Sequence, residues 1–545
     1  MELTGGGRPS RRDVLRGAAG AVGAAAAFAL AGCGGSRRIE GRIVGPSEER
    51  GHRLRSSGAL PAPTVREDVP VVVAGGGVAG LSAAWRLARA GSTDFVLLEL
   101  EDRVGGTSAS GRNAVSRHPL GAHYLPRPTR EQRALCELLR EARIVEGFDA
   151  KGRALPVEGT LCRDPEERLF EGGDWHEGLF PLAGATADDL RQHERFRAVV
   201  DAFAARRDDE GRRAFAIPTA RSARDADLVA LDGISAAAWL AREGFTSRPL
   251  RWYVEYACRD DFGASLEGTS AWAALHYFAS RIAVPGDDAA PLLTWPEGNG
   301  RLVDALAAGN ASRIRTGVVV LEIRPLPDRV VVRWLDAVRG VVGETTAEHV
   351  VCALPRFAAR RVVRGLEGER EGFATSPWVV ANVTLDEAPA SDGFPLAWDN
   401  VIRESASLGY VDATHQADRR ERSTVWTWYR PFPDADAAGA RRRILETPWE
   451  GWRDAVLADL APAHHDFERH VVAIDVVRWA HGMVRPAPGF LFGGARERAA
   501  DPLGRCRFAA ADLGGLGLFE EAQWAGVRAA EDVLTARGAT FESWA

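Results

Sequence analysis

The chain has 545 residues, of which 46% are hydrophobic and 26% charged, with a formal net charge of −6 and a pI of about 6.1. That length accommodates two or three domains, or one large domain with another inserted, and the composition is ordinary for a soluble globular protein. Because no run dense in lysine and arginine is interleaved with aromatic residues, we expect no nucleic-acid partner.

Residues 1–33 have the features of an export signal. Ser10 to Arg16 (S-R-R-D-V-L-R) resembles a twin-arginine signal, and the apolar stretch after it is too short and too rich in Ala and Gly for a membrane span. Leu30 to Cys33 resembles a bacterial lipobox, although a chance L-A-G-C inside an ordinary cleavable signal is the alternative. We therefore predict export by the twin-arginine route to the periplasm, with a lipid anchor at Cys33 as the membrane contact.

Residues 34–66 are rich in Gly, Arg, Ser and Pro, which is typical of a tether. The sequence therefore predicts a linker over these residues, of which Gly51 to Arg55 is the part expected to pack on the folded domain. The folded region is predicted to start near Asp68.

Neither a metal site nor a disulfide framework is indicated. Apart from Cys33, the cysteines form no C-x-x-C pair, and Cys352 and Cys506 lie in apolar runs where buried free thiols are expected. The histidines within residues 464–470 have the charged neighbours of an exposed helix, so we reject metal binding there.

A buried strand, a helix and a second strand are predicted in succession. Val69 to Ala74 contains consecutive apolar residues without alternation, as in a strand buried on both faces. A helix is predicted from Val78 to Ala90, ending at Gly91, and Phe95 to Leu98 is the second strand. Together these elements form one βαβ unit.

The turn of this unit contains Gly75, Gly77 and Gly80 in the spacing G-x-G-x-x-G. The first glycine permits a tight turn, the second lets backbone N–H groups approach a pyrophosphate, and the third lets the helix lie close to the strand. The phosphates would then lie at the positive end of the helix dipole. Glu99 ends the second strand, where a carboxylate can accept hydrogen bonds from ribose hydroxyls, which argues against NADP. The sequence thus predicts a dinucleotide site.

Six motifs then occur in a fixed order: Glu99 to Gly106, Pro119 to Pro126, Trp295 to Val303, Val320 to Ile323, Val350 to Pro355 and Arg507 to Gly526. The first (E-L-E-D-R-V-G-G) resembles the E-x(3)-R-x-G-G stretch of the flavin amine oxidase superfamily, which includes amine and polyamine oxidases, protoporphyrinogen oxidase and phytoene desaturases. The whole set, over residues 68–540, resembles that superfamily and implies FAD. No cysteine stands where some members attach the flavin, so the resemblance implies non-covalent binding.

The resemblance also implies the role of each motif. Gly105 and Gly106 contact the diphosphate, the segment around Gly121 lines the flavin ring, and the backbone of Val320 contacts adenine. Asp512 contacts the ribityl–diphosphate end, and the helix after Leu518 points its N-terminus at the flavin C2 carbonyl, where it would stabilise negative charge. The implied FAD contacts are Gly75, Gly77, Val78, Ala79, Gly80, Glu99, Leu100, Arg103, Gly105, Gly106, Thr107, Gly121, Ala122, His123, Tyr124, Val320, Asp512, Leu518 and Phe519.

The predicted fold is α/β, with a Rossmann-like FAD-binding domain assembled from residues 67–150, 292–372 and 474–545. An α+β cap over the flavin, formed by residues 151–291 and 373–473, would hold the substrate. The cap is rich in aromatic residues, including Trp426 and Trp428 on one face of a strand, and core packing is the simpler interpretation for most of them. The adjacent charges within residues 259–263 are either solvated or paired at a cavity.

The segment Arg478 to Met483 precedes the last motif, and in the family the corresponding tryptophan-containing strand passes close to the flavin. Trp479 and His481 are therefore the candidate catalytic residues. The unperturbed pKa of histidine lies near neutrality, so His481 could act as a base, with a structural role as the alternative.

Three positions depart from the family pattern. Many members have arginine where this chain has Thr107. Amine oxidases commonly use a lysine that holds a water near flavin N5, but the only lysine here, Lys151, matches no motif. Leu518 stands where monoamine oxidases place one of two aromatic residues that frame the substrate. The last two departures favour a dehydrogenase with a membrane electron acceptor over lysine-assisted reaction with O2.

The sequence therefore predicts an FAD-dependent oxidoreductase that moves a hydride from a small organic substrate to flavin N5. Oxidation of an amine C–H bond and desaturation of a C–C bond both remain open. The alternative function is a non-catalytic periplasmic protein that keeps FAD as a structural element.

Overall fold

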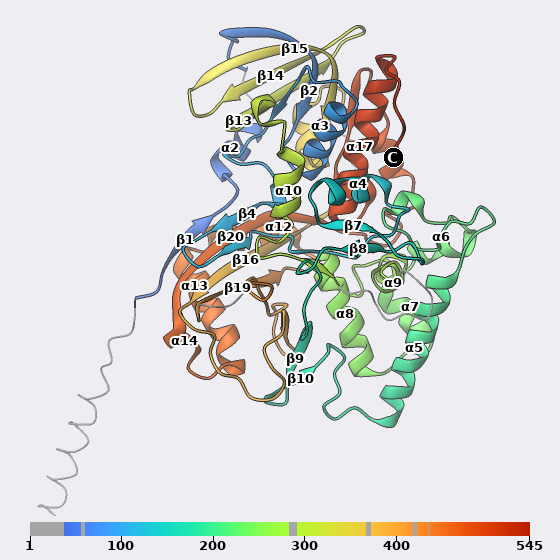
Figure 1. The fold of residues 1–545 in the computed structure, drawn as a ribbon, viewed down its shortest axis with the longest axis vertical. Coiled ribbons are helices and arrows are strands. Elements are labelled where there is room, and N and C mark those ends of the chain that lie inside the picture. The colour runs from blue at the N-terminus through green and yellow to red at the C-terminus, as the bar shows by residue number, and fades with distance from the viewer. Residues whose placement is uncertain (1–37, 56–59, 283–291, 367–371, 418–421, 434) are drawn as a thin grey trace, which may run out of the picture. The chain divides into compact units, whose positions relative to one another are not determined.

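The computed structural model describes residues 38–55, 60–282, 292–366, 372–417, 422–433 and 435–545. The chain divides into two compact units, Met1–Glu40 and Gly41–Ala545, and the architecture below is that of the second (Figure 1). The twin-arginine motif and Cys33 lie outside the described residues. Within the described ranges, no helix combines the length and the apolar composition that a membrane crossing requires.

The first sheet has its strands in the order β12-β3-β2-β15-β14-β13, and β21 also pairs with β15. The pairs among β12, β3, β2, β15 and β21 are parallel, whereas β14 is antiparallel to β13 and β15. Strands from distant parts of the chain lie side by side, which confirms the predicted α/β fold with a Rossmann-like domain. The bounds are β2 Val65–Ala74, β3 Phe95–Leu98, β12 Ile314–Arg315, β13 Val318–Pro325, β14 Val330–Asp336, β15 Val341–Cys352 and β21 Cys506–Phe508.

Burial on both faces explains the uninterrupted apolar run of β2. Val71 and Val73 pack into a core with helix α3 (Val78–Arg89) and helix α17 (Phe519–Ala536). The alternate residues Val72 and Ala74 pack into a second core on the opposite face, with residues of β13 and β14. Because side chains alternate between the two faces of a strand, both sets must be apolar here.

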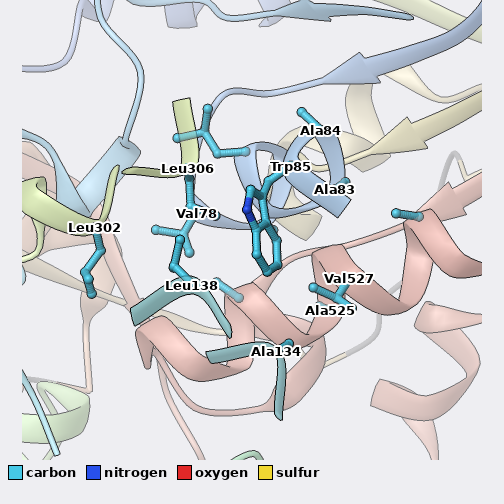
Figure 2. Close-up of a cluster of buried hydrophobic side chains, with 14 of the residues drawn as sticks. Val78, Ala83, Ala84, Trp85, Ala134, Leu138, Leu302, Leu306, Ala525 and Val527 are labelled. Atoms are coloured by element: carbon cyan, nitrogen blue, oxygen red, sulfur yellow. The ribbon is translucent and has the colours of Figure 1, made fainter. Parts of the chain in front are cut away.

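Helices α3 and α17 pack directly against each other beside this sheet (Figure 2). Trp85 of α3 is buried between α17 and helix α4 (Arg133–Glu141), with Val527 in the same core. Gly526 makes the close approach possible, because a Cβ at this position would overlap the carbonyl oxygen of Ala79. The first turn of α3 is thereby held against the middle of α17.

The second sheet has its strands in the order β1-β20-β16-β19-β18-β17-β9-β10. Together with a group of helices it forms the mixed α and β substructure expected for the cap. The strands are β1 Glu40–Val44, β9 Glu167–Glu171, β10 Asp174–Glu177, β16 Thr375–Leu385, β17 Asp399–Ile402, β18 Tyr410–Asp412, β19 Thr424–Pro431 and β20 Val471–Val484. The helices are α5 Ala187–Ala205, α6 Ala226–Asp232, α7 Ala236–Arg242, α8 Arg248–Phe262, α9 Ala271–Ala279, α12 Ala437–Glu446, α13 Trp449–Leu460 and α14 Phe467–His470.

Short paired strands and helices connect these two parts. The pairs are β4 (Ser110–Arg112) with β5 (Arg117–Pro119), β6 (Tyr124–Leu125) with β11 (Leu293–Thr294), and β7 (Val145–Phe148) with β8 (Ala154–Pro156). The remaining helices are α2 Glu48–His52, α10 Gly300–Ala307, α11 Arg356–Val362, α15 Ala495–Ala500 and α16 Ala511–Gly514.

The structure differs from the sequence expectation at two boundaries. Residues within the predicted linker form β1 and α2, and the first sheet begins at Val65 rather than near Asp68. Strand β20 crosses the boundary at residue 474 between cap and FAD-binding segments, because it pairs with β16 along almost its whole length. Pairing partners far apart in sequence decide both boundaries, and local composition does not reveal them.

The prediction of an exposed helix around His464 is wrong. This side chain is buried, and its Nε2 lies 2.8 Å from the hydroxyl of Tyr410. Trp426 stacks on Tyr410 at 4.0 Å between ring centroids and completes this cluster, as core packing predicts. Helix α14 starts only at Phe467, so His464 lies before it. Cys352 and Cys506 are buried free thiols, as expected.

Replacing Gly526 with alanine tests the contact between α3 and α17. We expect Gly526→Ala to lower the free energy of unfolding by roughly 1–3 kcal/mol, because the added methyl group meets backbone that cannot move aside. Urea unfolding followed by tryptophan fluorescence measures the change. Gly51→Ala in α2 is the control, because a Cβ there meets no atom within 4 Å. An unchanged midpoint for Gly526→Ala would show that the two helices can separate at little cost.

Candidate active site

The glycine turn after β2 has the geometry of a phosphate cradle. Gly75 adopts φ +104° and its N–H donates to the carbonyl of Leu98 at 2.8 Å, and a Cβ at Gly80 would overlap the carbonyl oxygen of Gly75. A Cβ at Gly77, in contrast, would meet no atom within 4 Å. Gly77 is the N-cap of α3 and supplies no side-chain cap, so the N-terminal N–H groups of the helix are placed to bind an anion.

Glu99 lies beside this turn, at the end of β3. Its carboxylate accepts hydrogen bonds from the N–H of Gly76 at 2.6 Å and from the N–H of Glu101 at 2.8 Å. Burial raises the pKa of Glu99 to about 7, against the opposing effect of these bonds. Glu99 therefore lies next to the helix N-terminus, where a carboxylate is expected to accept hydrogen bonds from the ribose hydroxyls of a bound dinucleotide.

The glycine pair Gly105–Gly106 lies next to the glycine turn that follows β2. Gly105 and Gly106 adopt φ +116° and +55°, and the N–H of Gly105 donates to the carbonyl of Gly76 at 2.8 Å. Gly106 and Thr107 are exposed, and a Cβ at Gly106 would lie 3.5 Å from the Cα of Gly77. Arg103 is also exposed, and its guanidinium donates to the carbonyl of Ser110 at 3.1 Å.

Part of the predicted linker covers the same loop. The N–H of Ser47 donates to both carboxylate oxygens of Glu101, at 2.9 and 3.1 Å. Arg50 donates to the carbonyl of Leu100 at 3.1 Å and forms an ion pair with Asp102 at 2.8 Å. Sequence analysis missed these contacts. The local signal was a serine N-cap followed by two glutamates in the first turn of α2, which is a helix start.

Three of the predicted motifs meet at the segment that the family resemblance assigns to the flavin ring. The N–H of Ala122 donates to the carbonyl of Thr107 at 2.9 Å, and a Cβ at Gly121 would overlap that same oxygen. From the other side, the N–H of Asn299 donates to the carbonyl of Ala122 at 3.1 Å, and the hydroxyl of Thr294 donates to the carbonyl of His123. The segment is therefore held on both sides by backbone contacts.

The C-terminal motif contributes a carboxylate and a helix N-terminus. Asp512 is buried and accepts a hydrogen bond from the N–H of Arg356 at 2.6 Å, which links it to the motif ending at Pro355. Leu518 is the N-cap of α17, Phe519 is its first residue, and Leu518 makes no side-chain cap. Val320 lies in β13 beside an irregularity in the pairing with β14.

Aromatic rings gather next to Gly121. The His123 ring lies 4.6 Å from Tyr429 and 5.5 Å from Trp398, centroid to centroid, and 5.1 Å from Tyr124. The hydroxyl of Tyr429 donates to the carbonyl of Gly121 at 2.8 Å, so strand β19 of the cap is attached directly to this segment. Burial lowers the pKa of His123 to about 4, so its imidazole is neutral at physiological pH.

Carboxyl groups line the cap side of these rings. Asp261 forms an ion pair with Arg281 at 2.7 Å, and both contact the hydroxyl of Tyr124. Its neighbour Asp260 forms no ion pair among the described residues, and burial followed by the charge of Asp261 raises its pKa to about 7, against the opposing effects of Arg281 and of a hydrogen bond from Tyr277. The cavity interpretation of residues 259–263, which the sequence left open, therefore fits these two aspartates.

Two further carboxyl groups, the partly buried one of Asp399 and the buried one of Glu520, were missed by sequence analysis. Asp399 accepts a hydrogen bond from the hydroxyl of Tyr256 at 3.2 Å, and burial, Asp260 and Glu167 together raise its pKa well above the usual range. Glu520, in the first turn of α17, is buried with one carboxyl oxygen unpartnered, and burial raises its pKa to about 7. The signal for Asp399 was its position after a buried tryptophan at the start of a strand, which is too common a pattern to point to a site.

The candidate catalytic residues occupy different surroundings. Trp479 donates from its indole N–H to the carbonyl of Leu120 at 2.7 Å, next to the aromatic group. His481 stacks on Phe357 at 4.0 Å, its Nδ1 lies 2.8 Å from the hydroxyl of Thr375, and burial lowers its pKa to about 4. The catalytic roles of both stay predictions. Lys151 is exposed in the turn between β7 and β8.

Comparison with known proteins agrees with this architecture. The profile of the family described as flavin-containing amine oxidoreductase matches residues 78–534, and the chain belongs to this family. Membership implies a flavin cofactor, and the glycine cradle, Glu99 and the two helix N-termini fit a flavin dinucleotide.

The individual proteins that this chain resembles share little sequence identity with it. Polyamine oxidase 7 of Oryza sativa subsp. japonica is 29% identical over 115 residues, which span 20% of this chain and only 24% of the rice protein. Wild-type putrescine oxidase bound to putrescine has a similar fold, with a TM-score of 0.63 at 16% identity over 86% of this chain and 100% of that one. Cyclohexylamine oxidase from Brevibacterium oxydans IH-35A gives a TM-score of 0.61 at 16% identity, with the same coverage.

Gly77→Val tests the cradle. The valine side chain would enter the open space at the N-terminus of α3, so we expect flavin affinity to fall roughly 10-fold or more while the flavin-free protein stays folded. Flavin content after gel filtration and the thermal midpoint of the flavin-free protein measure the two effects. Gly147→Ala, which also adds a side chain into free space but far from the cradle in sequence, should leave both unchanged. Undiminished flavin affinity in Gly77→Val would place the phosphates elsewhere.

Proposed function

We propose that the protein binds FAD non-covalently and oxidises a substrate amine at the C–H bond adjacent to nitrogen. When bound, FAD supplies the acceptor for the hydride of that bond. The observation that carries the proposal is the presence of two partly buried carboxyl groups, Asp260 and Asp399, beside aromatic rings, neither of which forms an ion pair among the described residues.

The buried carboxyl groups favour amine oxidation over C–C desaturation. A buried carboxylate is costly unless a cation compensates it, and the nearby Arg281 is already paired with Asp261. A protonated amine supplies the missing charge as it binds and passes one N–H proton to such a carboxylate before the C–H hydride leaves, whereas a polyene carries no charge. The rings of His123, Tyr429 and Trp398 add surfaces that attract an ammonium group and exclude water.

The residues around the ring segment then have distinct tasks. Backbone hydrogen bonds of Ala122 hold the segment in place, and the hydroxyl of Tyr429 attaches it to the cap through the carbonyl of Gly121. The neutral imidazole of His123 contributes to the site without repelling a cation. The N-terminus of α17, beginning at Phe519, has no side-chain cap and would stabilise negative charge on the flavin ring if that ring lies beside it.

The proposal also covers the cellular location of the enzyme and its electron acceptor. We propose export by the twin-arginine route and a lipid anchor at Cys33, which would hold the enzyme next to a membrane. The only lysine, Lys151, is exposed and matches no motif of the family, which supports a membrane electron acceptor rather than lysine-assisted reduction of O2.

Anaerobic mixing with amines tests the reaction. We expect primary amines to bleach the visible absorbance of oxidised flavin, and an uncharged polyene to leave it unchanged. Photoreduction with a sacrificial donor is the control, because it shows that the flavin is redox-active. A flavin that is photoreduced but never bleached by any amine would contradict the proposed function, and a redox-inert flavin would support a structural role for FAD.

The pH dependence of cation binding follows from the raised pKa values. A carboxyl group with a pKa of about 7, such as that of Asp260, is neutral below that pH and ionised above it. The inhibitor is an alkyltrimethylammonium ion, which has no proton to lose. We expect its inhibition constant to rise as pH falls from 8 to 6. For each carboxyl group that must be ionised, the rise should be at most about tenfold per pH unit. In Asp260→Asn this dependence should weaken. A flat profile in the wild-type enzyme would show that buried carboxylates do not bind the cation.

A further inference from the structure

A pocket lies beside the candidate active site, where three segments distant in sequence meet. Residues from 126–132, 210–221 and 280–281 line it, and its volume is about 390 Å³. That volume is in the range of pockets that bind small organic molecules. Arg281 belongs to the lining and also forms the ion pair with Asp261, so the pocket adjoins the acidic and aromatic groups described above.

The lining of this pocket is rich in positive charge, although the whole chain has a formal net charge of −6. The charged residues of the lining are Arg127, Arg212, Arg213, Arg221, Arg281, Glu131 and Glu210. Arg127, Arg212 and Arg281 each form an ion pair with an aspartate. Arg213 and Arg221 form no ion pair within the part of the chain that the structure describes, so their charges are available to a ligand.

Arg213 is buried in the wall of the pocket with an incomplete set of hydrogen bonds. Only 8% of the residue is exposed, and its Nη2 donates to the carbonyls of Ala279 and Ile282 at 3.3 and 2.6 Å. Its Nε has no acceptor among the described residues. Burial, followed by the charge of Arg207, lowers the pKa of Arg213, against the opposing charge of the exposed Glu131. A buried cation is costly when no counter-ion accompanies it.

Two further donors on this wall have no acceptor. The half-buried side chain of Arg221 makes no hydrogen bond to any described residue, and the buried Oγ of Ser280 has no partner there either. The N–H of Ala223 donates to the carbonyl of Arg213 at 2.8 Å, which holds the segment containing Arg221 beside Arg213. Buried polar groups in folded proteins are nearly always hydrogen-bonded, so several unsatisfied donors around one pocket indicate a ligand that accepts hydrogen bonds.

We propose that this pocket binds an oxyanion, the phosphate or carboxylate group of a small molecule, between the guanidinium groups of Arg213 and Arg221. A guanidinium group presents paired N–H donors that match two oxygens of a carboxylate or a phosphate. The same lining repels an ammonium group, so the oxyanion is a second ligand and the reacting amine binds elsewhere. The inference goes beyond the proposed function and does not depend on it. Because Arg281 is common to the pocket and to the ion pair with Asp261, the anion binds next to the candidate active site.

Calorimetric titration with inorganic phosphate and with succinate tests the proposal. The protein retains its flavin, so that phosphate cannot enter the glycine cradle at Gly77, and added chloride keeps the ionic strength constant. We expect at least one of the two anions to bind with a dissociation constant of about 1 mM or lower. The anion that binds more tightly shows whether the pocket is adapted to a phosphate or to a carboxylate.

Three matched substitutions locate the bound anion. Arg213→Gln and Arg221→Gln should each weaken binding roughly 10-fold or more, because each removes a charged hydrogen-bonding group. Arg221→Gln breaks no side-chain contact to a described residue and should leave the thermal midpoint unchanged, so it decides the test if Arg213→Gln does not fold. Arg324→Gln removes an exposed arginine from β13, outside the pocket, and should bind the anion as the wild type does.

Three results would overturn the inference. The first is that neither anion binds, and the second is that the folded pocket variants bind it as tightly as the wild type. The third is an equal loss of affinity in Arg324→Gln, which would show that binding responds to overall charge and not to this pocket. Reduction of the flavin by amines is a separate measurement, so each of these results leaves the proposed function standing.

Discussion

Backbone-to-backbone contact at two glycines determines where the cofactor cradle lies. Gly80 lets α3 approach the carbonyl of Gly75 at the end of β2, and Gly526 lets α17 approach the carbonyl of Ala79 in the first turn of α3. Any side chain at either position would separate these elements. Because of the two contacts, the N-termini of both helices belong to one rigid assembly with the central parallel strands, and the C-terminal motif meets a turn formed more than four hundred residues earlier in the sequence.

Two carboxyl groups at the candidate active site, those of Asp260 and Asp399, form no ion pair among the described residues. The cap brings the partly buried carboxyl groups of Asp260 and Asp399 near each other, and the hydroxyl of Tyr256 donates to Asp399. Burial of unpaired carboxyl groups costs stability, and proteins retain such groups where a ligand completes them. The alternation of β9 and β17 contributes to this, since it sends Arg168 to the opposite face.

The N-terminal segment connects the two substructures. Ser47 and Arg50 bind the loop that follows Glu99, while Glu48 forms an ion pair with Arg478 of β20. A segment with the composition of a tether therefore contacts both the dinucleotide turn and the sheet of the cap. Its helix start was visible in sequence, but its partners were not, because they lie about fifty and four hundred residues away.

The sequence by itself determined the local parts of this protein. The βαβ unit, its glycine turn and the acid at the end of the second strand follow from short-range rules of backbone conformation, and the ordered motifs indicated the flavin family. Only the tertiary structure decided which side chains distant in sequence lie together. Asp399 and Glu167 become neighbours through a strand register, His464 becomes buried through Trp426, and β20 joins the cap through β16. Register and packing depend on the balance of contacts over the whole chain, so no local pattern of residues contains them.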